Sequence, residues 1–269
     1  MHSDQQAELS VWKRLRIQRE ESVATITLDR PEVLHALDAL MFDELETAFA
    51  ELSAAPQIRV ILLTGSGDRA FAAGADIRGL LEIDETGGQA LSTRGQQVFR
   101  GIELCPKPVI ACINAVALGG GCELALACTL RLASDRARLG LPEAKLGLIP
   151  GYGGTQRLPR LVGRGAALRL LLTGAIVDAE EARRIGLVDE VIPAAELMTR
   201  ARTLAQAIAS LAPLAVSGVL EAVAQGEQLE LEEALRLESR IFGRLCGTAD
   251  KQEGVNAFLE KRPPAWTAR

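Results

Sequence analysis

The sequence predicts a layered α/β core over residues 11–193, followed by an all-helical region over residues 194–269. Short apolar or β-branched runs alternate with helix-spaced apolar patterns in the first part, and this alternation is typical of α/β folds. After Pro193 only helical periodicity remains. Residues 1–10 are polar at first and lack an apolar pattern, so we expect them to form a disordered leader outside the core.

The first half of the core begins with two predicted strands, residues 15–20 and 22–29, rich in β-branched side chains. Asp38 is then expected to cap a helix. Residues 58–64 and 108–113 are short apolar runs between turn-forming residues, which indicates buried strands. The apolar positions of the helix repeat every three or four residues: Met41, Leu45, Ala48 and Leu52.

The segment 109–130 is long and apolar enough to suggest a membrane span. However, it contains three consecutive glycines, 119–121, and Glu123 near its middle. These residues suit a lipid-facing helix poorly. We therefore predict a buried strand followed by a buried helix, and no membrane interaction. A carboxylate in so apolar a stretch requires an explanation.

The last elements of the core are a helix capped by Asp178 and ending at Gly186, and a strand over residues 187–192. Three or four helices are expected after Pro193, because apolar residues then share helical faces. These faces are Leu197, Ala201, Leu204, Ile208 and Leu211; Leu231, Leu235, Phe242 and Leu245; and Val255, Phe258 and Leu259.

Composition excludes several classes of function. The chain has 269 residues, a net charge of −5 and only 3% aromatic residues, which argues against nucleic-acid binding. Its two histidines, His2 and His35, cannot build a multi-histidine zinc site, and no Gly-x-Ser-x-Gly motif accompanies them, so we expect no metal. The five cysteines form no Cys-x-x-Cys pair and no secretory signal is visible, so we expect a cytoplasmic protein with reduced thiols.

Two glycine-containing segments could present backbone N–H groups to a ligand. Phe71-Ala-Ala-Gly74-Ala75-Asp76 has small residues around its glycine, which allow a close approach of the backbone; alternatively it is only a tight turn. Gly119-Gly-Gly121 precedes a helical stretch, so its N–H groups would lie at the positive end of a helix dipole. No Gly-Lys-Ser/Thr follows, which excludes a P-loop.

Glu123 and Glu143 are the candidate acid–base groups. Glu123 would lie on the first turn of the helix after the glycines, and Glu143 follows a proline before a glycine-dense turn. Either could be an ordinary charged residue, but together they supply the two carboxylates that acid–base catalysis needs in a chain poor in histidine. With two amide clusters, they match proton transfer beside a carbonyl whose enolate oxygen must be stabilised. Thr64-Gly-Ser-Gly67 suggests dinucleotide binding instead, but its fingerprint is incomplete.

Four segments together resemble the enoyl-CoA hydratase/isomerase (crotonase) superfamily. They are FAAGADI, ALGGGCELALAC, LPEAKLGLIPGYGGTQRLPRLVG and TGAIVDAEEARRIGLVDEVIP, in the order and spacing of that family. The resemblance extends from Leu28-Asp-Arg-Pro31 to Phe258-Leu-Glu-Lys-Arg262. It implies a crotonase-like spiral of ββα units with a C-terminal helical trimerisation region, and hence a homotrimer or a dimer of trimers.

The resemblance also implies roles for individual residues. The backbone amides of Ala75 and Gly120 would form the oxyanion hole for a thioester carbonyl, Glu123 and Glu143 would be the catalytic glutamates, and Gly151 would help to place the catalytic water. The expected CoA or acyl contacts are Arg78, which could equally be a solvated arginine, Phe242 near the acyl pocket, and Phe258 and Lys261 near the adenine end, often from a neighbouring subunit.

The implied reaction is the reversible syn addition of water to a trans-2-enoyl-CoA, giving a (3S)-3-hydroxyacyl-CoA. It needs no cofactor, since coenzyme A is part of the substrate. Glu143 is expected to supply the proton to C2, and Glu123 to activate the hydroxyl that reaches C3. The alternative is an enoyl-CoA isomerase or another enolate reaction of the family; an RNA-binding branch is disfavoured by the charge, and a scaffold would not need both glutamates.

The chain departs from the family pattern at three positions. His35 stands where the family usually has Asn, and we expect a structural role with a local hydrogen bond. Glu32 weakens one possible phosphate contact. Tyr152 replaces a smaller residue and is expected either to narrow the acyl pocket or to cap it. The loop 80–92 is where we expect acyl-chain preference to be set.

Overall fold

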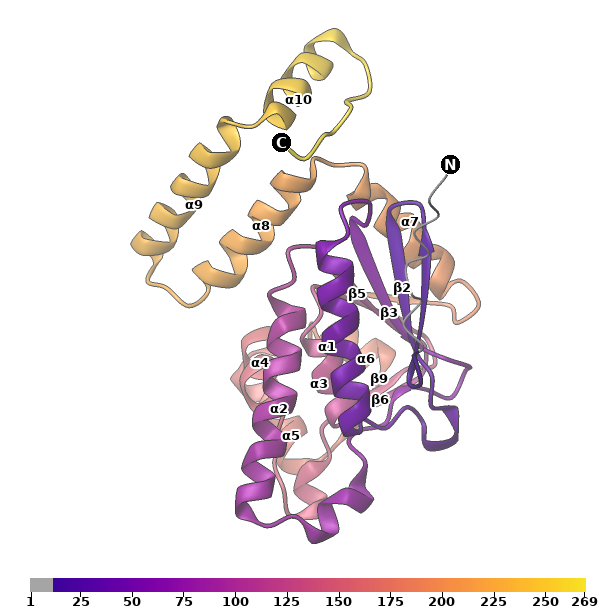
Figure 1. Cartoon of the computed structure of the whole chain (residues 1–269). Coiled ribbons are helices and arrows are strands. Elements are labelled where there is room, and N and C mark those ends of the chain that lie inside the picture. The colour runs from indigo at the N-terminus through magenta and orange to yellow at the C-terminus, as the bar shows by residue number, and fades with distance from the viewer. Residues whose placement is uncertain (1–11) are drawn as a thin grey trace, which may run out of the picture.

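The computed structural model describes residues 12–269, apart from the side chains of Ile77 and Arg78. The predicted leader, residues 1–10, lies outside the described residues. Two sheets form the centre of the core (Figure 1). The larger has the order β1 (Leu15–Glu20), β2 (Val23–Leu28), β3 (Val60–Gly65), β5 (Val109–Ile113), β7 (Leu130–Ser134) and β10 (Glu190–Ile192). The smaller has the order β4 (Ala70–Ala72), β6 (Val116–Leu118), β8 (Arg138–Gly140) and β9 (Ile176–Asp178).

Consecutive strands of the core are divided between the two sheets. β3, β5 and β7 each enter the larger sheet, and the next strand, β4, β6 or β8, enters the smaller one. Within each sheet these strands are parallel. A helical segment follows each pair, so the chain advances as a spiral of ββα units, as expected.

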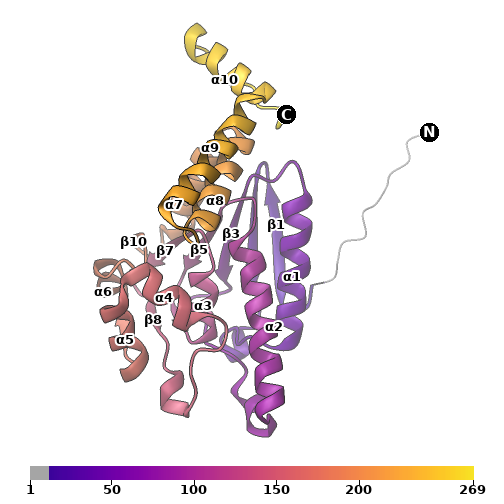
Figure 2. The ribbon, with the colours of Figure 1, turned by 90° about the vertical axis from the view of Figure 1, so that its left-hand side faces the viewer.

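Helices cover both faces of the larger sheet. α1 (Ala39–Ala54), α2 (Glu85–Glu103) and α3 (Gly120–Leu126) enclose the main core on one face, and α7 (Leu197–Ala209) packs on the other (Figures 1 and 2). Strands buried on both faces have continuous apolar runs, which explains the pattern of β3 and β5. The other helices are η1 (Pro31–Val33), η2 (Ile77–Glu82), η3 (Glu143–Leu146), α4 (Gly154–Val162), α5 (Arg164–Thr173) and α6 (Ala179–Arg184).

Local sequence signals fix several boundaries as predicted. The Asp38 side chain accepts a hydrogen bond from the Met41 amide at the start of α1, and Asp178 caps α6 in the same way. The strand predicted over residues 187–192 begins only at Glu190. The reason is that the Leu187 amide still donates to Ala182 in the turn after α6.

The apolar segment 109–130 is a strand, a second short strand and a helix, all within the core. Every residue of α3 is buried, including Glu123, which agrees with the prediction of a buried strand followed by a buried helix. Among residues 12–269, no single helix is long and apolar enough to cross a membrane; one pair, α7 and α8 (Pro213–Gly226), passes by length and composition but is bent by 103°.

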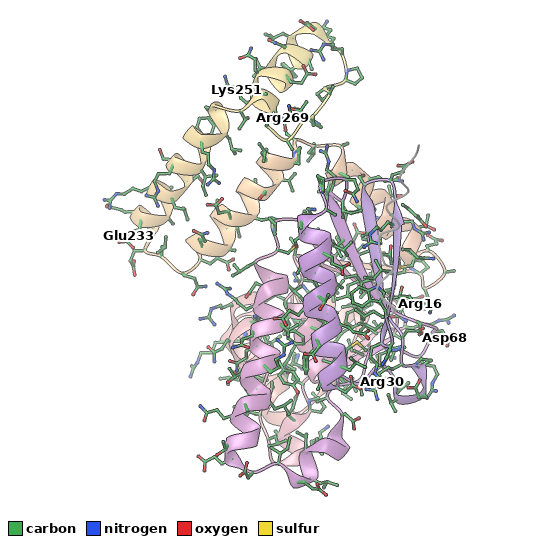
Figure 3. The ribbon with its side chains drawn as sticks, in the orientation of Figure 1. Arg16, Arg30, Asp68, Glu233, Lys251 and Arg269 are labelled. Atoms are coloured by element: carbon green, nitrogen blue, oxygen red, sulfur yellow. The ribbon has the colours of Figure 1, made fainter. Side chains whose placement is uncertain are left out.

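The last three helices project from the core as an arm (Figures 1 and 2). They are α8 (Pro213–Gly226), α9 (Leu231–Cys246) and α10 (Ala249–Glu260). The chain then returns along α10, so that Arg269 lies near Lys251 (Figure 3). Asp250, which is buried, accepts hydrogen bonds from the Thr267 and Ala268 amides. These bonds fix the C-terminal segment to the arm.

Candidate active site

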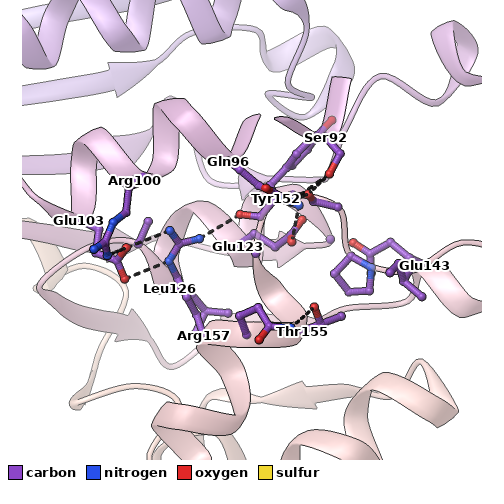
Figure 4. Close-up of a pocket in the computed structure, with 18 of the residues that line it drawn as sticks. Ser92, Gln96, Arg100, Glu103, Glu123, Leu126, Glu143, Tyr152, Thr155 and Arg157 are labelled. Atoms are coloured by element: carbon purple, nitrogen blue, oxygen red, sulfur yellow. Dashed lines mark hydrogen bonds and ion pairs between the residues drawn. The ribbon is translucent and has the colours of Figure 1, made fainter. Parts of the chain in front are cut away.

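The edge of the smaller sheet brings distant motifs to one cavity. β4, β6 and β8 are parallel, so their carboxyl ends meet at the same edge, where ligands bind in many α/β folds. Ala75 follows β4, Gly120 follows β6 and Glu143 follows β8. All three line a cavity of about 1350 Å³ together with Glu123 and Gly151. Every residue predicted for the reacting centre therefore borders the same space (Figure 4 shows its two glutamates).

The Ala75 and Gly120 amides are held in place by neighbouring hydrogen bonds but do not themselves donate a hydrogen bond within the described residues. The Leu37 amide donates to the Gly74 carbonyl and the Asp76 amide donates to the Leu37 carbonyl, while the Gly119 amide donates to Gly140. Within residues 12–269, the N–H groups of Ala75 and Gly120 have no acceptor. Two fixed, unpaired donors at the wall of a cavity can bind an oxyanion.

Glycine is required where α3 approaches β4. A Cβ atom on Gly121 would stand 2.0 Å from the carbonyl oxygen of Ala72, which no side chain tolerates. Gly119 has a φ of +51°, a backbone conformation that favours glycine. The glycine run thus allows the start of α3 to pack directly against the strand that leads to Ala75.

Glu123 is almost completely buried, at 1% exposure. Its Oε1 accepts hydrogen bonds from the amides of Tyr152 and Gly154, at 2.8 and 2.7 Å. Burial raises the pKa of this carboxyl to about 7, and the charge of Glu143 acts in the same direction, while the two amide bonds oppose the rise. Glu123 can therefore both accept and release a proton near neutral pH.

Glu143 begins η3, is half-buried and lines the same cavity. Its Oε2 is buried and has no hydrogen-bond partner among the described residues. Its Oε1 lies so close to Gly119 that a Cβ atom there would come within 2.8 Å. Burial raises the pKa of this carboxyl too, which favours its protonated form and a role as a proton donor.

The turn from Gly151 to Gly154, which binds Glu123, is held by residues that the sequence reading missed. The Ser92 hydroxyl and the Gln96 amide of α2 both donate to the Gly151 carbonyl, at 2.6 and 2.9 Å. Arg157 donates to the Tyr152 carbonyl at 2.9 Å and forms an ion pair with Glu103 (Figure 4). The polar spacing 92, 96 and 103 on one helical face was the available signal.

Tyr152, which was expected either to narrow the acyl pocket or to cap it, lines the cavity. Its buried ring makes edge-on contacts with Phe42 and Phe99, with ring centroids 5.2 and 5.7 Å apart. The ring also lies against Gly120, whose Cβ atom would come within 3.0 Å of it, and against Gly95. Tyr152 therefore closes the cavity beside the unpaired Gly120 amide, and a side chain at position 95 or 120 would collide with or crowd its ring.

Three predicted contact residues lie outside the cavity within one chain. Phe242 on α9 is 69% exposed and Phe258 on α10 is 83% exposed; neither residue, nor Lys261 at the end of α10, lines the cavity. From the arm, Val219 and Val223 of α8 do line the cavity. The expected place of Phe242 in the acyl pocket is therefore not observed in the single chain. The side chain of Arg78 lies outside the described residues.

Two alternative interpretations are resolved by the structure. His35 is buried; its Nδ1 accepts from the Arg30 amide and its Nε2 donates to the Ser66 carbonyl, so it has the expected structural role. Residues 64–67 lead into β4 instead of a helix and do not line the cavity, which removes the dinucleotide-binding reading. In the described part of the chain, no group of three or more His, Cys, Asp or Glu side chains could hold a metal ion.

Comparison with known proteins identifies the family. The family model described as enoyl-CoA hydratase/isomerase matches residues 18–269. A short-chain-enoyl-CoA hydratase of Clostridium acetobutylicum is 43% identical, over 91% of this chain and 94% of its own. A crotonyl-CoA hydratase of Syntrophomonas wolfei is 41% identical, over 93% and 96%.

Solved structures agree with this assignment. The crystal structure of an enoyl-CoA hydratase from Bacillus anthracis superposes with a TM-score of 0.92 at 38% identity, and covers 96% of this chain and all of its own. A second enoyl-CoA hydratase structure, from Geobacillus kaustophilus, gives 0.90 at 40% identity, over 95% and 98%. The predicted α/β spiral with a helical C-terminal region is thus confirmed, and the chain belongs to the enoyl-CoA hydratase/isomerase family.

Proposed function

We propose that this protein hydrates short-chain trans-2-enoyl-CoA thioesters to (3S)-3-hydroxyacyl-CoA. The observation that carries the proposal is the convergence of Glu123 and Glu143 on one cavity that also presents the unpaired amides of Ala75 and Gly120. The relatives named as short-chain-enoyl-CoA and crotonyl-CoA hydratases support the same reaction and substrate class. Coenzyme A enters as part of the substrate, and the proposed reaction needs no other cofactor.

The amides of Ala75 and Gly120 are proposed to bind the thioester carbonyl oxygen. When the oxygen of water forms its bond to C3, the electron pair of the C2–C3 double bond moves toward this carbonyl, which gains enolate character. Donors that are already fixed stabilise the new charge without reorganising, and loss of one such donor typically costs about 3 kcal/mol of transition-state stabilisation. Their flanking hydrogen bonds to Leu37 and Gly140 keep them in place.

The two glutamates are proposed to divide the proton transfers. Glu123 accepts the proton of the water whose hydroxyl adds to C3, since two amides stabilise its carboxylate. Glu143 carries the proton that passes to C2, in keeping with its raised pKa and its unpaired, buried Oε2. An isomerase moves a proton within the substrate and needs no second carboxyl for water, so the pair favours hydration.

The arm is proposed to form the subunit contacts of a trimer or a dimer of trimers. Large apolar side chains on its surface are more exposed than is usual for a monomer: Val219, Val223, Leu231, Leu235, Phe242, Val255, Phe258 and Leu259. In such an assembly, Phe242, Phe258 and Lys261 could reach the acyl or CoA part of a substrate in a neighbouring subunit. Light scattering after size exclusion would measure the molar mass, and a monomer would contradict this proposal.

Crotonyl-CoA provides the direct test of the reaction. Hydration removes the conjugated double bond, so the absorbance of the conjugated thioester falls; if it persists with the wild-type protein, the proposed function is wrong. Glu143→Gln should lower kcat by about a hundredfold or more and keep KM within about threefold of wild type. The substitution removes a proton donor and leaves substrate binding nearly unchanged. Glu233→Gln, on the outer end of α9 (Figure 3), is the matched control.

A further inference from the structure

We propose that Arg157 is a positioning residue for this reaction: held by Glu103, it fixes the turn whose amides bind Glu123. The inference deepens the proposed function and rests on it. Neither side chain belongs to the pair of carboxyls or to the oxyanion amides. Their contribution is to hold the backbone on which the acid–base behaviour of Glu123 depends.

The turn needs an external support because of its own composition. Glycine occupies positions 151, 153 and 154, and Gly153 has a φ of +110°. Glycine has more backbone freedom than any other residue, so this turn is poorly fixed by its local sequence. Yet its amides at 152 and 154 must both reach the same oxygen of Glu123.

Arg157 supplies that support from the first turn of α4. Its Nη1 donates to the Tyr152 carbonyl at 2.9 Å, and it packs so closely on Gly153 that a Cβ atom there would collide with Nη1. Its Nε and Nη2 donate to the two oxygens of Glu103, at 3.2 and 3.0 Å. The Arg157 side chain is only 14% exposed. The two-point bond fixes the plane of the guanidinium, which in turn fixes the carbonyl that it binds.

Helix α2 supports two consecutive carbonyl groups of the turn, one directly and one through Arg157. Ser92 and Gln96 bind the Gly151 carbonyl, and Glu103 anchors Arg157, which binds the Tyr152 carbonyl (Figure 4). Positions 92, 96 and 103 share one helical face because their spacings of four and eleven residues are close to whole turns. Arg100 donates to Glu103 at 2.6 Å and orients its carboxylate further. The turn is thus clamped against one rigid element.

Loosening this clamp should change the protonation of Glu123. The charged and titratable groups that face Glu123 are Glu143 from η3, Arg157 from α4, Cys122 from α3 and Tyr152 from the turn. The positive charge of Arg157 and the hydrogen bonds from the two amides each lower the pKa of Glu123. Loss of Arg157 removes the charge and weakens both hydrogen bonds. The pKa should therefore rise, and less of the carboxylate should be present at neutral pH.

Four variants test the proposal: Arg157→Gln, Arg157→Lys, Glu103→Gln and the control Arg200→Gln. Arg200 forms an equivalent two-point pair with Glu190, and neither residue lines the cavity. With crotonyl-CoA, Arg157→Gln should lower kcat by about tenfold with KM within about threefold, and move the acidic limb of the kcat profile up by about half a pH unit or more. Glu103→Gln, which keeps the size and shape of the side chain but removes its charge, should move the acidic limb by a smaller amount in the same direction.

Arg157→Lys separates geometry from charge. Lysine keeps the positive charge but lacks the planar fork, so it should recover less than about half of the lost kcat. Full recovery, or an unchanged pH profile in Arg157→Gln with kcat within about twofold of wild type, would overturn the proposal. A shift of the pH limb in Arg200→Gln equal to that in Arg157→Gln would also overturn it, because the effect would then be general.

A direct titration distinguishes this inference from the reaction itself. Infrared difference spectra of protein labelled with 13C-glutamate report carboxyl ionisation without any substrate, and the Glu123→Gln spectrum identifies the Glu123 signal. A higher midpoint in Arg157→Gln supports the positioning role even if the wild type fails to hydrate crotonyl-CoA. An unchanged midpoint contradicts it even if the hydration assay succeeds.

Discussion

Glu123→Gln should make the protein more stable at neutral and alkaline pH while abolishing its proposed activity. In the folded state the pKa of Glu123 is raised, chiefly by burial, from an ordinary value of 4.5 to about 7. A raised carboxyl pKa means that the folded state holds its proton more tightly than the unfolded state. The stability contributed by that proton is fully present below pH 4.5 and is lost as the pH rises to about 7.

The magnitude follows from the same two values. Each pKa unit corresponds to about 1.36 kcal/mol, so the change from 4.5 to about 7 amounts to about 3 kcal/mol. Glutamine is neutral at every pH and keeps an oxygen that can accept from the amides of Tyr152 and Gly154. The free energy of unfolding of the variant minus that of wild type should therefore increase by about 2–3 kcal/mol between about pH 5 and pH 8.

Urea unfolding at a fixed protein concentration measures this gain. Wild type, Glu123→Gln and the control Glu233→Gln would be compared at several pH values between about pH 5 and pH 8. The protein concentration is kept the same throughout, because an oligomer's apparent stability depends on its concentration. The control should follow wild type at each pH. A difference between Glu123→Gln and wild type that stays constant over this range would refute the reasoning, since no linked proton would then be present.

Three further substitutions test how the cavity wall is built. Gly121→Ala should destabilise the fold by about 3 kcal/mol or more, or prevent folding, because the new Cβ atom would collide with the Ala72 carbonyl; soluble yield and the urea midpoint would show this. Tyr152→Ala should cost about 3–5 kcal/mol of stability by removing a buried ring, and should raise kcat/KM for six-carbon relative to four-carbon enoyl-CoA; an unchanged ratio would contradict its role as a wall. Asp38→Ala should cost about 1 kcal/mol or more in urea unfolding, because the Met41 amide loses its cap and Arg14 and Arg30 lose an ion pair; no change in midpoint would contradict that.

Elements that depend on residues close together in the sequence could be predicted from local patterns. The Asp38 and Asp178 caps, the apolar runs of β3 and β5, and the burial of α3 follow from residues close together in the sequence. The strand after Gly186 was predicted too long because a hydrogen bond to Ala182 keeps Leu187 in the turn after α6. Boundaries of this kind depend on partners outside the strand, which periodicity does not contain.

The reacting centre was predictable to the extent that it is built from motifs. Glu123 and Glu143 stood out because carboxylates in apolar or glycine-rich segments need a reason. The pair of Glu103 and Arg157 did not stand out, because its residues are 54 positions apart and each resembles a solvated charge. The predicted place of Phe242 near the acyl pocket is not observed in the single chain, where this residue is 69% exposed on the arm.

The features that make the cavity suitable for chemistry also destabilise the folded protein. Burial of Glu123, the unpaired Oε2 of Glu143 and the free amides of Ala75 and Gly120 each reduce the stability of the empty protein. A ligand whose carbonyl accepts from these amides supplies the missing partner. Crotonyl-CoA or its hydrated product should therefore raise the unfolding temperature, by an amount that grows with the logarithm of its concentration above Kd. If crotonyl-CoA raises it no more than free coenzyme A at the same concentration, the amides do not bind the thioester carbonyl.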